Sequence, residues 1–479
     1  MEFQDSSATS RVTALGNTCV LGLGSTGQAV ARYLAKRLGT RISSVTVFGG
    51  KTSQANDETR ALQEMGCTVV LGTEAVEGSY DLTVASPGIS EFSPFFLAAK
   101  ACSKEVISEP EFAWRESPSR WLAITGTNGK TTTTTLVRDL LRAGGFVAEA
   151  VGNIGKLAIT EVEERQAGEW LVAELSSYQL ATTQAFHPVA ACLLNITPDH
   201  LAWHKTMDNY AAAKARIFQN MNAGDLAVIS NSDEYCRSIA NSLNERGVRV
   251  CTLDVTGDPG GSCAAYLDGE MLVVRLDGDT HKLVSANQLA IAGVHNYQNA
   301  LAAAALALEA GVTPQDVRSG LCAFQPLEHR IEPCGELDGV RYVNDSKATN
   351  VDATSKALTA FAPGTIVLLA GGHDKGTELA SLARDVVATC RVAVCYGEAG
   401  SRIAQAFREE NACEHGNLEV YEAAHMQDAY ELARSLANAG ETVLLSPACS
   451  SFDEFSCFEE RGERFKALVA QDLADKESK

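Results

Sequence analysis

The stretch that decides the fold is Thr125-Gly126-Thr127-Asn128-Gly129-Lys130-Thr131, or T-G-T-N-G-K-T. An apolar run at 121–125 precedes it and predicts a buried strand, and a Thr- and Leu-rich run at 131–141 predicts a helix after it. The glycines let the backbone curl so that N–H groups point at phosphate oxygens, and the start of a helix adds a favourable dipole. The stretch therefore predicts a phosphate-binding loop.

The spacing of this loop is shorter than usual. A strict G-x-x-x-x-G-K-[ST] pattern would need glycine at position 124, where Ile124 stands. The alternative is an ordinary strand-to-helix turn that happens to contain Gly-Lys-Thr, but the strand before, the helix after and the placement of Lys-Thr together favour a phosphate-binding loop. Lys130 is placed to reach the β- and γ-phosphates of ATP, and the Thr131 hydroxyl to ligate Mg²⁺. The expected ATP contacts in the loop are Gly126, Thr127, Asn128, Gly129, Lys130, Thr131 and Thr132.

Outward from the loop, short runs rich in Val, Ile and Leu alternate with helical stretches, which is typical of buried parallel strands in an α/β fold. At roughly 100–200 residues per domain, 479 residues suggest about three domains. Boundaries at the polar stretch 116–120 and near 324–328 divide the chain into 1–118, 119–326 and 327–479. The segment 252–281, with its Gly and Asp turns, predicts short antiparallel strands within the middle domain.

The composition narrows the classes of function. The net charge is −20 and the pI about 4.9, which argues against a nucleic-acid partner. No apolar run is long enough to cross a membrane, and the polar segment 1–17 lacks the apolar core of a signal peptide and is interpreted as a short disordered lead segment. The 14 cysteines form no C-x-x-C pair and are interpreted as free thiols. We therefore expect a cytoplasmic enzyme with no membrane partner.

Candidate metal ligands follow two later apolar runs. Glu174 ends the run 171–175, so its carboxylate is expected at the carboxyl edge of the sheet beside the loop. His200 follows the run 190–195, and Lys214 lies in a predicted helix. Taken singly, Glu174 could be a surface acid, His200 a helix-start histidine and Lys214 a solvated lysine. Mg²⁺ needs only one or two protein oxygens, which Glu174 and Thr131 could supply.

The shortened loop resembles the ATP loop of the Mur ligase superfamily, which includes the folylpolyglutamate synthases. The strings E-L-S-S-Y-Q-L (174–180), N-I-T-P-D-H (195–200) and A-A-A-K-A-R-I-F (211–218) are similar to the branch that adds D-glutamate. The resemblance implies a carbamylated Lys214, which with Glu174 and His200 would hold a second Mg²⁺. It also implies that Asn153 lies near the reacting phosphate.

Further strings extend the resemblance towards the nucleotide. G-V-H-N-Y-Q-N (293–299) is similar to a family string whose asparagines, here Asn296 and Asn299, face adenine; capping of a helix is the alternative. Arg330 is expected at the γ-phosphate as the domains close. In N-D-S-K-A-T-N (344–350), Asp345 is expected at the ribose hydroxyls, and Lys347 is expected to stabilise the transferred phosphate.

The amino-acid end is predicted from two segments. A dicarboxylate substrate needs two anion sites; Lys375 with the Thr349 hydroxyl could form one, and the Ser451 hydroxyl with a backbone N–H near Phe458 the other. The resemblance implies the same for D-glutamate. The D-N-P-R string of the related diaminopimelate or lysine ligase is missing, and Phe452 stands where the family often has Leu.

The first domain carries G-L-G-S-T-G (22–27), which fits G-x-G-x-x-G. NAD binding would need an acid about 20 residues later, at the end of the second strand. Phe48 and Gly49 stand there, so NAD is disfavoured. The resemblance instead implies that this loop binds a UDP group, with contacts from Ser25, Thr26, Ser86 and Gly88. The family often has an aspartate at the end of that strand to meet uracil, and this chain lacks it.

The resemblance implies an ATP-dependent ligase that forms an acyl phosphate on UDP-N-acetylmuramoyl-L-alanine and joins it to D-glutamate, in peptidoglycan precursor synthesis. ATP, two Mg²⁺ ions and carbamylated Lys214 are the expected cofactors, and a monomer is expected. Three alternatives stay open: a sister ligase with another amino acid, an NAD-dependent oxidoreductase that uses 22–27, and a nucleotide-binding module without catalysis.

Overall fold

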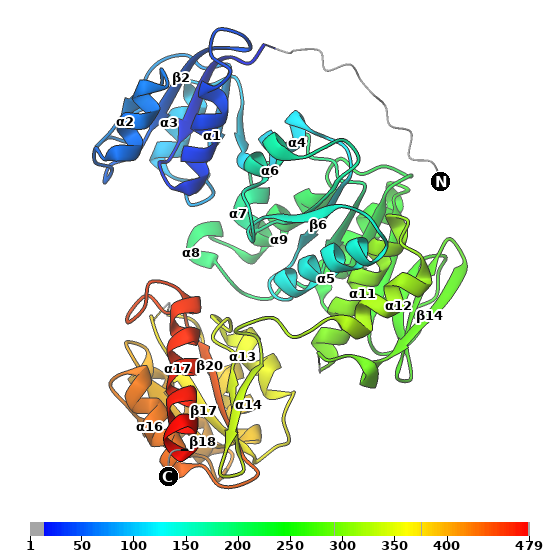
Figure 1. The fold of residues 1–479 in the computed structure, drawn as a ribbon, viewed down its shortest axis with the longest axis vertical. Helices are drawn as coiled ribbons and strands as arrows, with labels where there is room; N and C mark the ends of the chain where they lie inside the picture. Colours follow the sequence, from blue (N-terminus) through cyan, green and yellow to red (C-terminus); the bar gives the residue numbers. More distant parts are fainter. Residues whose placement is uncertain (1–13, 292, 375, 478–479) are drawn as a thin grey trace. The chain divides into compact units, whose positions relative to one another are not determined.

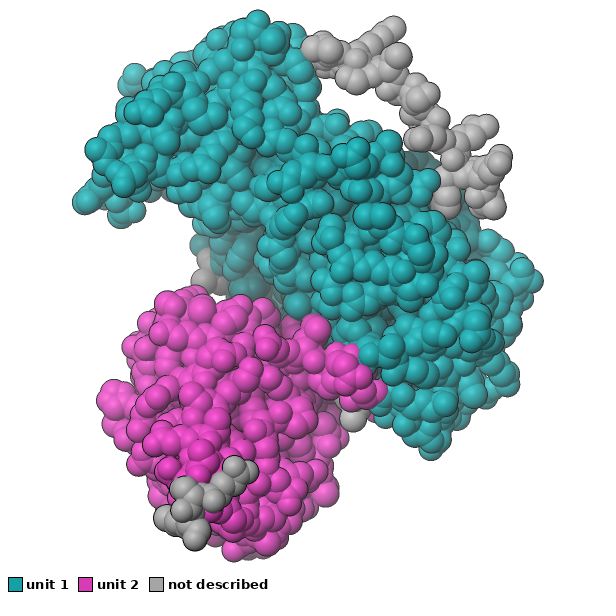
Figure 2. Space-filling view, viewed as in Figure 1, with its two compact units in different colours: residues 1–289, 296–324 teal, residues 290–295, 325–479 magenta. Residues whose placement is uncertain are grey.

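The computed structural model describes residues 14–291, 293–374 and 376–477 (Figure 1). These residues form three mostly parallel sheets with helices between the strands, which confirms the predicted α/β class. The chain divides into two compact units, residues 1–289 with 296–324 and residues 290–295 with 325–479 (Figure 2). The first two sheets lie in the first unit and the third sheet in the second.

The first sheet has the order β3-β2-β1-β4-β5, and all of its strand pairs are parallel. Its elements are β1 (Gly16–Leu21), α1 (Ser25–Ala35), β2 (Ile42–Phe48), α2 (Asp57–Glu64), β3 (Thr68–Val70), β4 (Leu82–Ala85), α3 (Pro94–Ala101) and β5 (Val106–Ser108). A close approach requires Gly27, because a Cβ there would lie 2.0 Å from the Gly22 carbonyl oxygen. The helix start is thereby held against the end of β1.

The second sheet has the order β14-β13-β12-β11-β10-β9-β6-β8-β7. Its strands are β6 (Trp121–Thr125), β7 (Ala148–Gly152), β8 (Trp170–Glu174), β9 (Ala190–Leu193), β10 (Leu226–Ser230), β11 (Arg249–Asp254), β12 (Ala264–Asp268), β13 (Met271–Leu276) and β14 (Asp279–Ser285). Every residue of β6, β8 and β9 is buried, as expected of central parallel strands. The segment 252–281, predicted as antiparallel, contains β12, β13 and the first residues of β14, which pair antiparallel, while β12 also pairs in parallel with β11.

Helices connect the strands of this sheet and follow it. They are α4 (Glu109–Glu116), α5 (Lys130–Ala143), α6 (Ala158–Glu164), α7 (Ser177–Leu180), α8 (Leu201–His204), α9 (Met207–Ala215), α10 (Glu234–Glu245), α11 (Val294–Glu309) and α12 (Pro314–Ala323), with 3₁₀ turns η1 (Arg216–Phe218) and η2 (Ala286–Gln288). Because β6 pairs with β8 and β9 in parallel, the residues after these three strands meet at one edge of the sheet.

The third sheet has the order β15-β16-β20-β17-β18-β19, parallel except for the β15–β16 pair. Its elements are β15 (Glu332–Leu337), β16 (Val340–Asn344), α13 (Val351–Leu358), β17 (Ile366–Gly371), α14 (Ala380–Thr389), β18 (Cys390–Tyr396), α15 (Gly400–Cys413), β19 (Glu419–Glu422), α16 (Met426–Leu436), β20 (Thr442–Ala448) and α17 (Phe458–Glu477). The loops after β16 and β20 are adjacent because these strands pair in parallel.

Some predicted details differ from the structure. Residues 16–17 belong to β1 rather than to a lead segment, because β2 continues the ladder to that point. Helix α11 begins at Val294, so Asn296 and Asn299 lie inside the helix and not at a cap before it. All 14 cysteines are free, as predicted. The earlier part of the lead, 1–13, and Lys375 lie outside the described residues.

The proposed domain boundaries fall between elements. The first, 118/119, lies between α4 and β6, and the second, 326/327, lies between α12 and β15. We keep both as proposals. Among the described residues, no helix is long and apolar enough to cross a membrane.

Candidate active site

The predicted phosphate loop links β6 to α5. Gly126 has φ +155° and Gly129 has φ +85°, conformations that side chains disfavour. A Cβ at Gly129 would also lie 2.4 Å from Asn299 Oδ1, so the loop needs glycine there for two reasons. Lys130 begins α5 and folds back over the loop, where its Nζ donates to the carbonyl oxygens of Gly126 (2.9 Å) and Thr127 (2.8 Å).

Asn195, just after β9, braces this loop from the neighbouring strand. Its carbonyl oxygen accepts from Thr127 N (2.9 Å), its Oδ1 accepts from Asn128 N (2.9 Å), and its Nδ2 donates to Asn128 O (3.1 Å). These contacts fix the backbone of the loop without using the lysine. In the sequence, Asn195 is part of the string N-I-T-P-D-H, and no pattern in the chain marks these contacts with the loop.

Lys214, on α9, points at the same carbonyl group as Lys130. Its Nζ donates to Gly126 O at 2.7 Å, and the side chain is almost fully buried. Burial, and then the charge of Lys130, lower the pKa of Lys214 well below its usual 10.5. A lowered pKa raises the share of the amine in its neutral form, which is the form that reacts with CO₂ to give a carbamate.

The side chain of Glu174, at the end of β8, is buried, and only one of its two carboxylate oxygens has a hydrogen-bond partner. Its Oε1 accepts from Asn153 Nδ2 at 2.7 Å, and Asn153 N donates to the Glu174 carbonyl oxygen at 2.9 Å. Its Oε2 is buried without a hydrogen-bond partner. A buried carboxylate oxygen without a partner is costly unless a cation or donor reaches it. The donor set therefore fits a bound Mg²⁺, with Glu174 as a ligand.

His200 precedes α8 in the left-handed conformation, with φ +56°. Its Nε2 lies 3.4 Å from Asp199 Oδ2, and its ring packs on Tyr178 with the centroids 4.8 Å apart. The Tyr210 ring lies 6.4 Å from the His200 ring and 4.6 Å from Lys214 Nζ. One aromatic side chain thus contacts both predicted ligands.

The sequence analysis missed two residues of this cluster. The Tyr210 hydroxyl is 3.0 Å from Thr127 Oγ1, so it joins α9 to the phosphate loop. His204 is buried, its Nε2 is 2.8 Å from Ser177 Oγ, and its Nδ1 has no partner. Burial lowers the pKa of His204 to about 4, so its ring is neutral. The spacing of Tyr210 from Lys214, one helical turn, was the available signal for the tyrosine.

The two predicted adenine contacts lie on α11. Asn299 is buried; its Oδ1 accepts from Thr133 Oγ1 (3.3 Å) and its Nδ2 donates to Asn296 Oδ1 (3.3 Å). Asn299 therefore packs against the phosphate loop and the start of α5. Thr131 and Thr132 lie in the first turn of α5, the former half-buried and the latter buried.

In the second unit, Asp345 is buried at the carboxyl end of β16. Its Oδ2 accepts from Ser446 Oγ at 2.7 Å and its Oδ1 from Ile331 N at 3.3 Å. Burial raises its pKa to about 7, although Ser446 and the nearby Arg330 charge act against that rise. The structure thus brings Asp345 and Arg330 together.

Lys347 and Phe458 meet at the start of α17. The ammonium nitrogen of Lys347 lies 3.7 Å from the centroid of the Phe458 ring. Phe458 is the first residue of its helix, a position where a backbone N–H lacks a helical acceptor. Thr349 is half-buried two residues after Lys347, and Ser451 is buried in the loop after β20.

Among the described residues, one group of three His or acidic side chains has its ligand atoms within 4.8 Å of one another, namely Glu328, His329 and Glu463. The ammonium of Lys466 is 3.0 Å from the Glu463 carboxylate and 3.6 Å from that of Glu328. The Lys466 ammonium therefore already offsets the negative charge of these carboxylates, and we assign no metal to this group.

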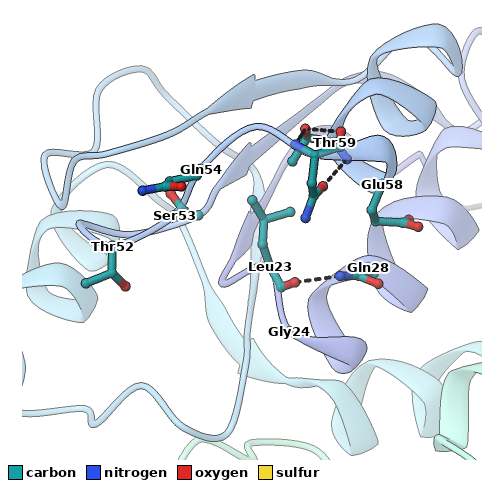
Figure 3. A pocket seen from close by; sticks show the side chains of 10 residues that line it. Leu23, Gly24, Gln28, Thr52, Ser53, Gln54, Glu58 and Thr59 are labelled. Carbon is teal, nitrogen blue, oxygen red and sulfur yellow. Dashed lines mark hydrogen bonds between the residues drawn. The ribbon is translucent and has the colours of Figure 1, made fainter.

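The first sheet carries a pocket of about 270 Å³ at the carboxyl ends of β1 and β2. Leu23 stands in it between Ser53 and Glu58, and Gln28 Nε2 donates to Leu23 O at 2.8 Å (Figure 3). A Cβ at Gly49 would lie 2.6 Å from Leu23 Cδ1 and 2.5 Å from Ser53 Oγ. A side chain at position 49 would therefore require Leu23 and Ser53 to move.

The predicted UDP contacts lie beside this pocket. Ser25 and Thr26 open α1, and Ser86 and Gly88 follow β4. The Ser86 Oγ is buried without a hydrogen-bond partner, and a Cβ at Gly22 would lie 2.7 Å from it. The two loops therefore meet, and Ser86 has an unused hydroxyl there.

A glycine-rich loop at the carboxyl edge of a parallel sheet, backed by a buried carboxylate and two lysines, defines a nucleotide-dependent enzyme that handles phosphate. Residues 124–307 match the Mur ligase middle domain, and residues 329–449 match the Mur ligase, glutamate ligase domain. The chain belongs to the Mur ligase family, and it is an ATP-dependent ligase.

Two relatives with the same name are similar to nearly the whole chain. The chain is 39% identical over 452 residues to the UDP-N-acetylmuramoylalanine–D-glutamate ligase of Pelotomaculum thermopropionicum, covering 94% of this chain and 96% of that one. The ligase of the same name from Geobacillus kaustophilus is 38% identical over 450 residues, 93% of this chain and 95% of the relative.

Solved structures agree on the fold. UDP-N-acetylmuramate–alanine ligase from Thermotoga maritima has a TM-score of 0.55 at 19% identity, covering 95% of this chain and 99% of its own. A pseudomurein peptide ligase from Methanothermus fervidus has a TM-score of 0.57 at 17% identity, covering 95% of this chain and 100% of its own.

Proposed function

We propose that the protein joins D-glutamate to UDP-N-acetylmuramoyl-L-alanine with ATP, as the names of its relatives state for them. The observation that supports the chemistry is the position of Lys130 and Lys214 on one carbonyl of the phosphate loop, next to the half-partnered Glu174. The positive charge of Lys130, together with a cation ligand in Glu174, suits the transfer of a phosphoryl group.

The reaction has two steps. A carboxylate oxygen of the alanyl group attacks the γ-phosphorus of ATP, the bond to the bridging oxygen breaks, and ADP leaves with that electron pair. The amine of D-glutamate then attacks the acyl carbon, loses a proton, and expels inorganic phosphate as the amide bond forms. Lys130, Arg330 and Lys347 are assigned to neutralise negative charge on the phosphoryl oxygens. Bound close together, the amine and the acyl phosphate react without a second encounter.

Two Mg²⁺ ions would offset phosphate charge when bound. Thr131 and Glu174 are assigned to one, and Glu174, His200 and the carbamate of Lys214 to the other. The carbamate forms when the neutral amine of Lys214 attacks CO₂ and releases a proton. Asn153 fixes the Glu174 carboxylate through its 2.7 Å hydrogen bond.

The remaining assignments concern substrate contacts. Asn296 and Asn299 are proposed at the adenine and Asp345 at the ribose of ATP. Thr349, Lys375, Ser451 and the backbone N–H of Phe458 are proposed for the two carboxylates of D-glutamate.

The UDP group is proposed to bind at the pocket of the first sheet, near Ser25, Thr26, Ser86 and Gly88. Uncharged groups would meet the uracil there, because Leu23 and Ser53 occupy the space of an acid at position 49. The exposed Gln54 amide, which can both donate and accept, is the candidate we favour.

The function is tested by measuring phosphate release with ATP and UDP-N-acetylmuramoyl-L-alanine against a panel of amino acids. We expect turnover with D-glutamate and none with L-alanine, L-lysine or diaminopimelate. Turnover with one of the others and not with D-glutamate would replace the proposal with a sister ligase of the family.

The proposal also includes a monomer that works in the cytoplasm, where ATP is available, without a nucleic-acid or membrane partner. Light scattering at assay concentrations tests the first part, and a mass of twice 50.9 kDa would contradict it.

A further inference from the structure

The first turn of α17 presents three side-chain positions on one face, because residues at i, i+3 and i+4 of a helix are neighbours. They are Phe458, Arg461 and Gly462. Two segments pack on this face, the turn at 329–330 and the loop at 345–349, and both carry cations assigned above to the transferred phosphate.

Arg461 fixes the loop at its backbone. The guanidinium is fully buried; its Nε donates to Ser346 Oγ (2.9 Å), one NH₂ group to Ser346 O (2.8 Å) and the other to Cys449 O (3.1 Å). Ser346 Oγ in turn donates to the Phe458 carbonyl oxygen at 2.8 Å. The residue before Lys347 thus makes three hydrogen bonds with the start of α17.

Gly462 fixes the other segment. A Cβ there would lie 2.2 Å from His329 Nδ1, so glycine lets the histidine pack directly on the helix. The His329 ring then lies 6.0 Å from the Phe458 ring, edge to face. The His329 carbonyl oxygen accepts from Lys347 N at 3.1 Å, which joins the two segments beside Phe458.

We propose that the ring of Phe458 is a positioning group for Lys347. The ring holds the ammonium at 3.7 Å, and the carbonyl of the same residue anchors Ser346, so Phe458 contacts both the tip of the lysine and the residue at its base. An aromatic face attracts an ammonium ion but offers no competing negative charge. The lysine is thus pre-oriented and can exchange the ring for a phosphoryl oxygen during the reaction.

This inference rests on the proposed function and separates two roles of Phe458, one for its backbone and one for its ring. The amino-acid contact assigned above uses its backbone N–H, which every substitution except proline keeps. The effect on Lys347 uses the ring. Replacing the ring should therefore lower kcat and leave the KM for D-glutamate within about two-fold.

The test compares Phe458→Leu with Phe458→Tyr, which keeps the aromatic face. We expect Phe458→Leu to lower kcat about 10-fold and Phe458→Tyr to stay within about two-fold of the unchanged protein, as the strength of ammonium–ring contacts implies. Phe465→Leu is the matched control, since Phe465 is a fully buried residue of the same helix that packs on Tyr430. It should keep kcat at temperatures where the protein is folded.

A double-mutant cycle identifies the partner. In a Lys347→Met background, measured by single turnover, adding Phe458→Leu should cause no further loss. An equal loss in both backgrounds would overturn the inference, because the ring would then act through another residue. Equal kcat for Phe458→Leu and the unchanged protein would also overturn it.

A readout without turnover separates this inference from the proposed function. The rate at which an amine-acylating reagent modifies Lys347, followed by peptide mass mapping, should change in Phe458→Leu and not in Phe465→Leu. No phosphate release by the unchanged protein with D-glutamate would refute the proposed function alone. An unchanged rate of Lys347 labelling in Phe458→Leu would refute the positioning role alone.

Discussion

The two units hold their proposed catalytic lysines in opposite ways. In the first unit, Lys214 is buried, donates to a carbonyl oxygen of the phosphate loop, and has a pKa far below its usual value. In the second unit, Lys347 is half-buried with its ammonium on an aromatic ring. The first environment favours a neutral amine ready for covalent change, and the second favours a cation ready to meet phosphate. The type of residue does not decide its role; the surroundings do.

The largest effect should come from the first unit, at the carboxylate that we propose as a Mg²⁺ ligand. Glu174→Gln keeps the hydrogen bond from Asn153 but removes the charge that suits a metal ion. We expect turnover to fall by about 10³-fold, in line with the loss of one main charge-stabilising group. Phosphate release at saturating Mg²⁺ measures it, with Glu164→Gln, an exposed acid, as the control. A loss below about 10-fold would remove Glu174 from the metal site.

The second largest loss of turnover should follow when the carbamate that we propose on Lys214 cannot form. Removing CO₂ and bicarbonate from the buffers should lower turnover by roughly 10²-fold, and adding bicarbonate should restore it, because the carbamate would be a charge-stabilising group of the site. Lys214→Arg, which cannot form a carbamate of this kind, should stay inactive with bicarbonate. Turnover that ignores bicarbonate would show that the amine itself acts in the reaction.

The burial of Asp345 in the second unit can be tested through the pH dependence of the free energy of unfolding. Burial raises its folded pKa to about 7 from 3.8, so the folded state holds the proton more tightly than the unfolded state. Its contribution is fully present below about pH 4 and is lost as the pH rises through about 7. Asp345→Asn should therefore be more stable than the unchanged protein at pH 8, by ~2 kcal/mol, and show a flatter pH dependence.

Urea unfolding of both proteins at pH 5 and pH 8 measures this difference. Asp385→Asn, which lies on α14 in the same unit, is the control. A parallel pH dependence in Asp345→Asn and the unchanged protein would place the titrating group elsewhere.

The smallest effect is expected at the pocket of the first sheet. Gln54→Ala removes one uncharged group that could reach the base, so the KM for the UDP-linked substrate should rise about three-fold with kcat unchanged. Gln63→Ala, an exposed glutamine on α2 outside the pocket, should leave KM unchanged. An unaltered KM for Gln54→Ala would mean that backbone groups alone meet the base.

Much of the first unit could be predicted from the sequence, because its chemistry follows directly after strands. The loop after β6 and Glu174 after β8 come together at one sheet edge, which is a property of parallel strands that a linear pattern reveals. Asn195 lies at the same edge after β9, but no pattern marks its contacts with the loop. The family resemblance added Lys214, whose place on a helix gives no such signal.

Contacts made by small residues and by long-range packing could not be predicted. The lack of space for a side chain at Gly49 depends on Leu23 and Ser53. The packing of the 329–330 turn on the start of α17 depends on Gly462 facing His329. These are distances between segments that are far apart in the chain, and no periodicity or motif encodes them. The same holds for Arg461, which reads as an ordinary helix arginine and is fully buried.

The most direct test of the account follows an oxygen atom through the reaction. UDP-N-acetylmuramoyl-L-alanine labelled with ¹⁸O in its terminal carboxylate is turned over with ATP and D-glutamate, and the inorganic phosphate is analysed by ³¹P NMR. An acyl phosphate predicts one ¹⁸O in each phosphate released from fully labelled substrate. Unlabelled phosphate alongside formation of the amide would contradict the account.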